Sequence, residues 1–216
     1  MRRLFLGMLL LVPVPSLAFI AIETDQSQPY EIVPVEAPLG EARYFLGELE
    51  GFPIMYEVTA ADPFTFTATV RQPAGQTQQP FSLIVIRQND RGGGVREIAR
   101  MNQLPEDWST VRDGEIGLSF TQSEAISKPV EPGIYRIEVS TPQNAGKYLL
   151  QIGSEPADTG YFAQLGAART TQAFFGYGIF SMLGSTLVFY PLGILLLLFG
   201  IYKTWQYRHV FKHGAA

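Results

Sequence analysis

Acidic side chains around Trp108 form the first cluster in this sequence whose residue types could bind a ligand. Asp107 comes directly before Trp108, and Asp113 follows a short distance after it. An aromatic ring flanked by carboxylates is a candidate carbohydrate-binding patch, and clustered carboxylate oxygens are candidate calcium ligands. The spacing does not follow a regular calcium loop, which favours a solvated loop with the tryptophan packed on the edge of a domain.

The two histidines are the second candidate cluster. His209 and His213 are four residues apart near the C-terminus, so a helix would place both on one face, as a metal pair requires. No carboxylate or cysteine lies near them, which favours a basic tail beside a membrane. The chain has no cysteine, and its other residues include no histidine, so a Ser-His-Asp or Cys-His catalytic group is excluded outside this tail. We therefore expect no enzymatic activity, no cofactor and no bound metal.

The N-terminus has the features of a secretory signal peptide. Arg2 and Arg3 precede a short apolar stretch, and small residues at positions 16 and 18 precede a cut before Phe19. An uncleaved N-terminal anchor is the alternative, but the apolar stretch is short for a membrane span. Residues 1–18 are therefore predicted to be a cleaved signal peptide.

An uncharged segment near the C-terminus predicts one membrane span. No charged side chain occurs from Thr170 to Tyr202, and the stretch from Ile179 onward is long enough to cross a bilayer as a helix. We expect residues 173–202 to form an aromatic interfacial segment followed by the transmembrane helix. The tail, residues 203–216, is basic, which is typical of the cytoplasmic side. The predicted protein is thus single-pass in the cell membrane, with its N-terminal domain periplasmic or extracellular.

Small residues within this segment offer a candidate surface for a partner helix. Ser181, Gly184 and Ser185 lie close together in the sequence. Small side chains allow two membrane helices to approach closely. The alternative is that such residues are simply common in membrane helices.

Short strands separated by turn residues occupy residues 19–153. Phe64 to Val70 alternates strictly between apolar and threonine side chains, which predicts a strand with one face in a core. Gly133 to Gly153 reads as a final hairpin, with Pro142 in its connection. No stretch of the domain has a convincing amphipathic helical pattern, and residues 154–172 are taken as a juxtamembrane linker. The predicted fold class is all-β: an antiparallel β-sandwich of about seven or eight strands, plus one C-terminal transmembrane helix.

The last two strands also carry a resemblance to a known type of domain. A "G-x-Y-x-x-x-V" strand is followed by a "Y-x-L-x-x-G" strand, formed here by Gly133, Tyr135, Val139, Tyr148, Leu150 and Gly153. With roughly residues 40–153 as a whole, this resembles bacterial pre-peptidase C-terminal and GOLD-like jelly-roll sandwiches. The resemblance implies a fold and no activity. The layout of the chain is distantly similar to the p24 cargo-receptor family, but it lacks that family's cysteine pair, long coiled coil and dilysine ending, so the cargo-receptor function does not carry over.

The charge distribution excludes one class of partner. The formal net charge is −4, and all the acidic residues lie between Glu23 and Asp158. A net-acidic domain argues against nucleic-acid binding. The predicted function is a membrane-anchored, non-enzymatic protein-interaction module of the bacterial envelope, with an unidentified protein partner. The alternatives are an accessory subunit that a larger membrane complex recognises through its transmembrane helix, and a carbohydrate- or calcium-binding module.

Overall fold

A computed structural model describes residues 18–24, 28–29, 31–36, 38–89, 94–101 and 104–213, and it describes side chains as far as Tyr207. The predicted signal peptide lies outside the described residues except for Ala18. The side chains of His209 and His213 also lie outside them.

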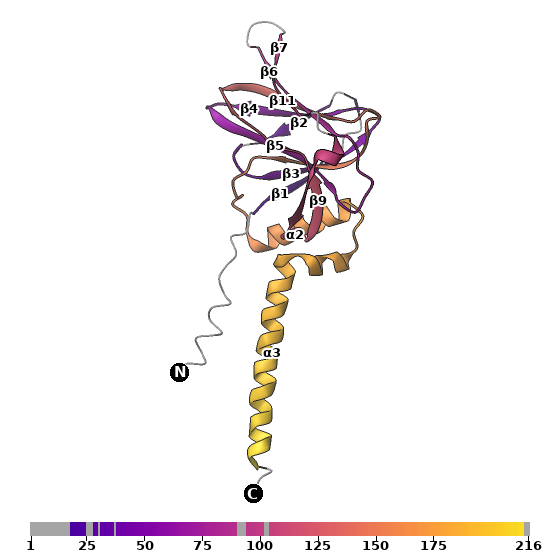
Figure 1. Ribbon diagram of the computed structural model, residues 1–216. Helices are drawn as coiled ribbons and strands as arrows, with labels where there is room; N and C mark the ends of the chain where they lie inside the picture. The colour runs from indigo at the N-terminus through magenta and orange to yellow at the C-terminus, as the bar shows by residue number, and fades with distance from the viewer. Residues whose placement is uncertain are drawn as a thin grey trace.

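The strands form two mixed sheets that pack face to face (Figure 1). The large sheet contains β1 (Ile20–Thr24), β3 (Arg43–Glu50), β5 (Phe64–Pro73), β8 (Ser109–Asp113), β9 (Leu118–Gln122), β10 (Ile126–Val130) and β12 (Ala145–Ile152). Its order is β1-β3-β12-β5-β9-β8, with β10 also paired to β5. The small sheet contains β2 (Ile32–Val35), β4 (Ile54–Ala60), β6 (Ser82–Gln88), β7 (Val95–Met101) and β11 (Gly133–Ser140). Its order is β2-β4-β11-β6-β7. The predicted β-sandwich is therefore confirmed.

The alternating residues of the strands fill the core between the sheets. In β5, Phe66, Ala68 and Val70 are fully buried, as the pattern predicted. Tyr148 of β12 meets Tyr56 of β4 across this core, and their hydroxyl oxygens are 2.9 Å apart. That hydrogen bond satisfies two buried phenol groups that would otherwise be left without water.

The last two strands do not form the predicted hairpin. β11 pairs with β4 and β6 in the small sheet, whereas β12 pairs with β3 and β5 in the large sheet. Each strand has one complete apolar face, and the two faces meet in the same core. The alternation is therefore satisfied equally by strands that pair and by strands that face each other across a sandwich. Most strand pairs are antiparallel, as predicted, but β1 pairs with β3, and β2 with β4, in parallel.

A helical layer covers the outer face of the large sheet. It consists of helix α2 (Tyr161–Phe174), the 3₁₀ helix η2 (Ile179–Gly184) and the start of helix α3 (Thr186–His213). A second apolar cluster fills the space between this layer and the sheet, and it includes Leu46, Ile116, Phe120, Leu149, Ala168, Phe175 and Met182. The folded unit thus extends well past Gly153, into the segment that was expected to be a linker.

Helix α2 was missed because its inward side is not apolar. Its buried residues are Gln164, Ala168, Thr171 and Gln172. Small and polar residues at these positions give no apolar stripe of helical period, which is the signal that sequence reading relies on. The helix ends at a Schellman turn, in which the Tyr177 amide donates to the Gln172 carbonyl at 2.9 Å and Gly176 has a φ of +81°.

Helix α3 is the one helix in the described part of the chain that is long and apolar enough to cross a membrane, over Thr186–Tyr207. It extends away from the sandwich on the side of the helical layer (Figure 1). Pro191 lies inside it. Pro191 comes five residues after Thr186, the first residue of the helix. Most of the described side chains of α3 are exposed.

Candidate functional site

The turn between β8 and β9 holds the beginning of α3 against the sandwich. Gly117 ends this turn with a φ of +76°, a conformation that L side chains rarely adopt. A Cβ atom at this position would lie 2.5 Å from the Ser185 backbone nitrogen. The Thr186 amide donates to the Gly114 carbonyl at 2.8 Å. The backbone of the turn therefore contacts the backbone that precedes α3, and Gly117 permits this approach because it has no side chain. We call this contact between residues 112–117 and residues 181–187 the junction.

Ser185 is fully buried at the centre of the junction. Its hydroxyl donates to the Glu115 carbonyl, and it accepts from the Leu187 amide at 3.2 Å. The second contact makes Ser185 the N-cap of α3, a position at which serine is among the preferred residues. Arg112 donates to the Gly184 carbonyl at 3.1 Å. One serine thus begins the candidate span and ties it to the β-domain at the same time.

Helix α2 closes the junction from the side. The Gln172 amide nitrogen donates to the Ile116 carbonyl at 2.5 Å, and its amide oxygen accepts from the Ser181 hydroxyl at 2.5 Å. The Tyr161 hydroxyl donates to the Leu187 carbonyl at 2.6 Å. The β8–β9 turn, helix α2 and the segment before α3 are therefore joined by one set of hydrogen bonds.

Asp113 supports the turn from within. Its carboxylate accepts from the Glu115 and Ile116 amides, at 3.1 and 2.9 Å, and pairs with Arg71 at 3.2 Å. Arg71 also donates to the Tyr44 hydroxyl at 3.4 Å. Burial, which disfavours the charged phenolate, raises the pKa of Tyr44 to about 12, although the nearby Arg71 cation opposes this rise.

The predicted ligand loop is not assembled by the fold. Trp108 is buried in the core between the two sheets, while Asp113 lies beside Tyr44 on the other face of the large sheet. Asp107 is exposed at the end of the 3₁₀ helix η1 (Pro105–Asp107). Among the residues that the structure describes, no three His, Cys, Asp or Glu side chains gather as a metal site would require. The described structure therefore does not bring Trp108, Asp107 and Asp113 together as one exposed patch.

The predicted packing role of the small residues is also revised. Ser181, Gly184 and Ser185 lie before the candidate span, and the Gly184 and Ser185 backbone contacts Gly117 of the β-domain. The close approach that small residues permit does occur, but it is made within the chain. Phe175 belongs to the segment that was expected to be an aromatic interfacial segment. Its ring points inward instead and packs against Phe120, with ring centroids 5.9 Å apart.

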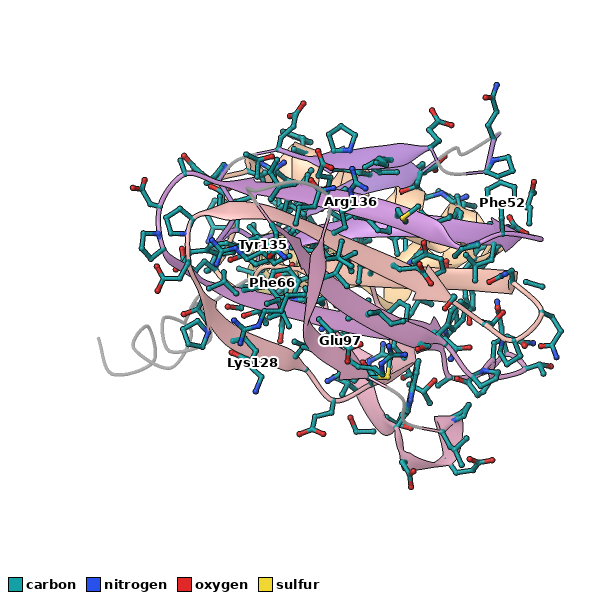
Figure 2. All side chains as sticks on the ribbon, turned by 90° about the horizontal axis from the view of Figure 1, so that it is seen from above. Phe52, Phe66, Glu97, Lys128, Tyr135 and Arg136 are labelled. Carbon is teal, nitrogen blue, oxygen red and sulfur yellow. The ribbon has the colours of Figure 1, made fainter. Side chains whose placement is uncertain are left out.

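The outer face of the small sheet is the second candidate surface, and we call it the distal face. Two rows of side chains cross its strands in register. The first row is Glu57–Arg136–Ile86–Glu97, and the second is Met55–Glu138–Ile84–Arg100. This face lies on the side of the molecule away from α3, and Figure 2 looks onto that side, with Arg136 and Glu97 labelled.

Ion pairs lie on either side of the isoleucines on the distal face. Arg136 contacts Glu57 at 3.0 Å, and Arg100 contacts Glu97 at 2.7 Å. Ile84 and Ile86 lie between these pairs and are partly exposed. A shallow groove adjoins the face where Ser82 stands opposite Ser140, and its lining includes Phe81, Leu104 and Pro142. The surface is therefore mixed, with apolar patches bounded by charges.

Sequence reading named Ser181, Gly184 and Ser185 but missed the turn around Gly117 that they contact. The Asp-Gly at positions 113–114 and the glycine at 117 do indicate a tight turn. Nothing in the sequence links that turn to Ser185, because the contact is made between segments about seventy positions apart, as for Arg112 and Gly184.

The solved structures that are similar to this chain include two small β-domains. No protein-family model matches the chain, and no curated protein matches it. One similar structure is the pre-peptidase C-terminal domain of a collagenase from Bacillus anthracis, which is the type of domain that the sequence resembles. It is 15% identical with a TM-score of 0.36, over 59% of this chain and 98% of the other. The second is PliG from Aeromonas hydrophila, a periplasmic inhibitor of g-type lysozyme. It is 16% identical with a TM-score of 0.34, over 62% of this chain and 96% of the other.

Proposed function

We propose that this protein is a single-pass, membrane-anchored, non-enzymatic interaction module that presents the distal face to a protein partner outside the cytoplasm. The observation that carries the proposal is that, among the described residues, helices cover the outer face of the large sheet but not the outer face of the small sheet. The outer face of the large sheet is covered by α2 and η2 and is tied to the start of α3 through Ser185. Within the part of the chain that the structure describes, no helix covers the distal face, which lies on the side away from α3 (Figure 1).

The chemistry of the distal face supports a protein partner. Apolar side chains that are only partly exposed, such as Ile84 and Ile86, lose little further side-chain freedom when a partner covers them. The flanking arginines and glutamates would set the register of that partner by charge complementarity. Such a mixture of apolar and charged side chains is compatible with an interface between separately folded proteins, which is about as apolar as the rest of a protein surface.

The proposed orientation rests on the charges at the two ends of the chain. A signal peptide would export the domain, and the basic residues after Tyr202 would keep the tail in the cytoplasm. The junction would then hold the distal face at a fixed distance from the bilayer, so that this face binds its partner in one orientation.

Two matched substitutions test the proposal. Ile134 on the distal face and Val111 on the edge strand β8 are both β-branched strand residues that are 37% exposed. A photo-reactive amino acid at Thr59, which stands opposite Ile134 in the sheet, should cross-link the partner in native membranes. The substitution Ile134→Lys should abolish that cross-link, while Val111→Lys should leave it unchanged. Equal loss with both variants, or no loss with either, contradicts a role for the distal face.

The surface of α3 favours a second candidate function. A shallow groove on this helix is lined by Leu196, Leu197, Gly200, Ile201, Thr204 and Trp205. Small residues on a membrane helix let another helix pack closely. The protein would then be an accessory subunit that a larger membrane complex recognises through α3. Gly200→Leu should release the partner in that case, and it should have no effect if the partner binds the distal face.

A further inference from the structure

The helical layer carries large apolar side chains that point away from the protein. Phe162 of α2 and Phe180 of η2 are each 83% exposed, and Ile179 and Leu183 of η2 are more than half exposed. Soluble domains rarely leave several large apolar residues uncovered next to one another, and such patches mark contact with a membrane or a partner.

The short helix η2 is apolar on both of its sides. Met182 points inward and is buried in the cluster against the large sheet. Ile179, Phe180 and Leu183 point outward. No charged residue occurs between Arg169 and Lys203, so the outward side of η2 has no cation or anion of its own. A helix that is apolar all round is stable where both sides are removed from water.

The position of η2 identifies what covers its outward side. It ends at Gly184, and the candidate membrane span begins at Thr186. The hydrogen bond from Ser181 to Gln172 and the contact of Gly184 with Gly117 hold η2 in place. Figure 1 shows it lying across the axis of α3, at the point where α3 begins. Its exposed side chains are therefore held beside the first residues of the candidate span.

We propose that η2 and the first turn of α2 form an interfacial platform, in which Phe162, Ile179, Phe180 and Leu183 insert into the boundary between lipid headgroups and acyl chains. The proposal rests on the membrane anchoring proposed above and adds a second lipid contact to it. The contact is apolar, so it requires no anionic lipid. A span alone would leave the domain free to tilt on the membrane, whereas a span and a platform together fix its orientation.

The absence of cysteine makes a direct test available. Single cysteines can be introduced into the full chain and spin-labelled without background. The test positions are Phe180→Cys and Phe162→Cys. The matched controls are Leu196→Cys in the span and Val95→Cys on the small sheet, which are both 62% exposed. The labelled proteins are placed in phosphatidylcholine nanodiscs, and the collision rates of each label with oxygen, which enters lipid, and with a water-soluble nickel complex are compared.

Four outcomes are distinguishable. The platform predicts that the labels at 180 and 162, like the label at 196, collide more with oxygen than with nickel, whereas the label at 95 does the reverse. If the labels at 180 and 162 behave like the label at 95 while 196 remains in lipid, the platform is refuted and the anchor stands. If 196 also behaves like 95, the anchor itself fails. If 180 is shielded from both reagents, protein covers η2, and the platform is refuted in favour of a second copy of the chain.

Discussion

Replacing Gly117 with alanine should separate the start of α3 from the sandwich. The residue has a φ of +76°, and an alanine in the left-handed region costs about 1–2 kcal/mol. The new Cβ would also lie 2.5 Å from the Ser185 nitrogen and 2.6 Å from the Gly184 carbonyl carbon. Carbon atoms pack at about 3.5–4.0 Å, so the two backbones must move apart by roughly 1 Å.

That movement would break hydrogen bonds as well. A donor–acceptor distance of 2.8 Å between Thr186 and Gly114 would become too long for a hydrogen bond, and the contact of Ser185 with Glu115 would be lost with it. Each lost bond costs about 1 kcal/mol. The total for Gly117→Ala is therefore about 3–4 kcal/mol, the sum of the backbone strain and two hydrogen bonds.

A second glycine supplies the control. Gly176 has a φ of +81°, but nothing lies within 4 Å of the Cβ that alanine would add there. Gly176→Ala should therefore show the strain without the clash, at about 1–2 kcal/mol. In a chain of this size the difference of about 2 kcal/mol corresponds to roughly 4–8 °C in melting temperature, measured by near-ultraviolet circular dichroism in detergent. Amide hydrogen exchange at residues 185–187 should rise in Gly117→Ala alone. Equal melting temperatures for the two variants would refute the tight junction.

Three further predictions concern the β-domain. Burial raises the pKa of Tyr56 to about 12, above its unfolded value of about 10. The contribution of Tyr56 to stability should therefore be complete below pH 10 and should fall as the pH rises toward 12. The melting temperature of Tyr56→Phe should fall less over that range than that of the unsubstituted protein. Arg71→Met leaves the Asp113 carboxylate, 13% exposed, without its cation and should cost about 3–5 kcal/mol in chemical denaturation, whereas Arg100→Met, at a pair whose side chains are 43% and 48% exposed, should leave the curve nearly unchanged. Residues 18–153 alone lack α2 and should aggregate in size-exclusion chromatography, whereas residues 18–178 retain it and should elute as a monomer; monomeric behaviour of both would contradict a structural role for α2.

The sequence predicted those parts of the fold that depend on local alternation. Phe66, Ala68 and Val70 were placed correctly because the side-chain period of a strand is two, and the burial of each face follows from it. The long apolar helix α3 was predicted because a long uncharged stretch has few other interpretations. Both signals are contained in a short window of residues.

The partners of the elements could not be predicted in the same way. The alternation in β11 and β12 is the same whether the strands pair with each other or lie in opposite sheets. The candidate site depended on such partners. Ser185 was expected to meet a helix in the membrane, but its partner is the Glu115 carbonyl of a turn in the β-domain. The apolar neighbourhood of Ser185 is common to both environments, so composition alone did not separate them.

The docking of the sandwich on α3 can be measured as one distance distribution. Spin labels at Ile134→Cys on the small sheet and Leu192→Cys near the start of α3 would report it by pulsed electron double resonance, since the two residues are 37% and 42% exposed and the chain has no other cysteine. The junction predicts a single narrow distribution in nanodiscs, and Gly117→Ala should broaden it. A broad distribution in the unsubstituted protein would mean that residues 154–185 act as a flexible linker, and would contradict the fixed presentation of the distal face.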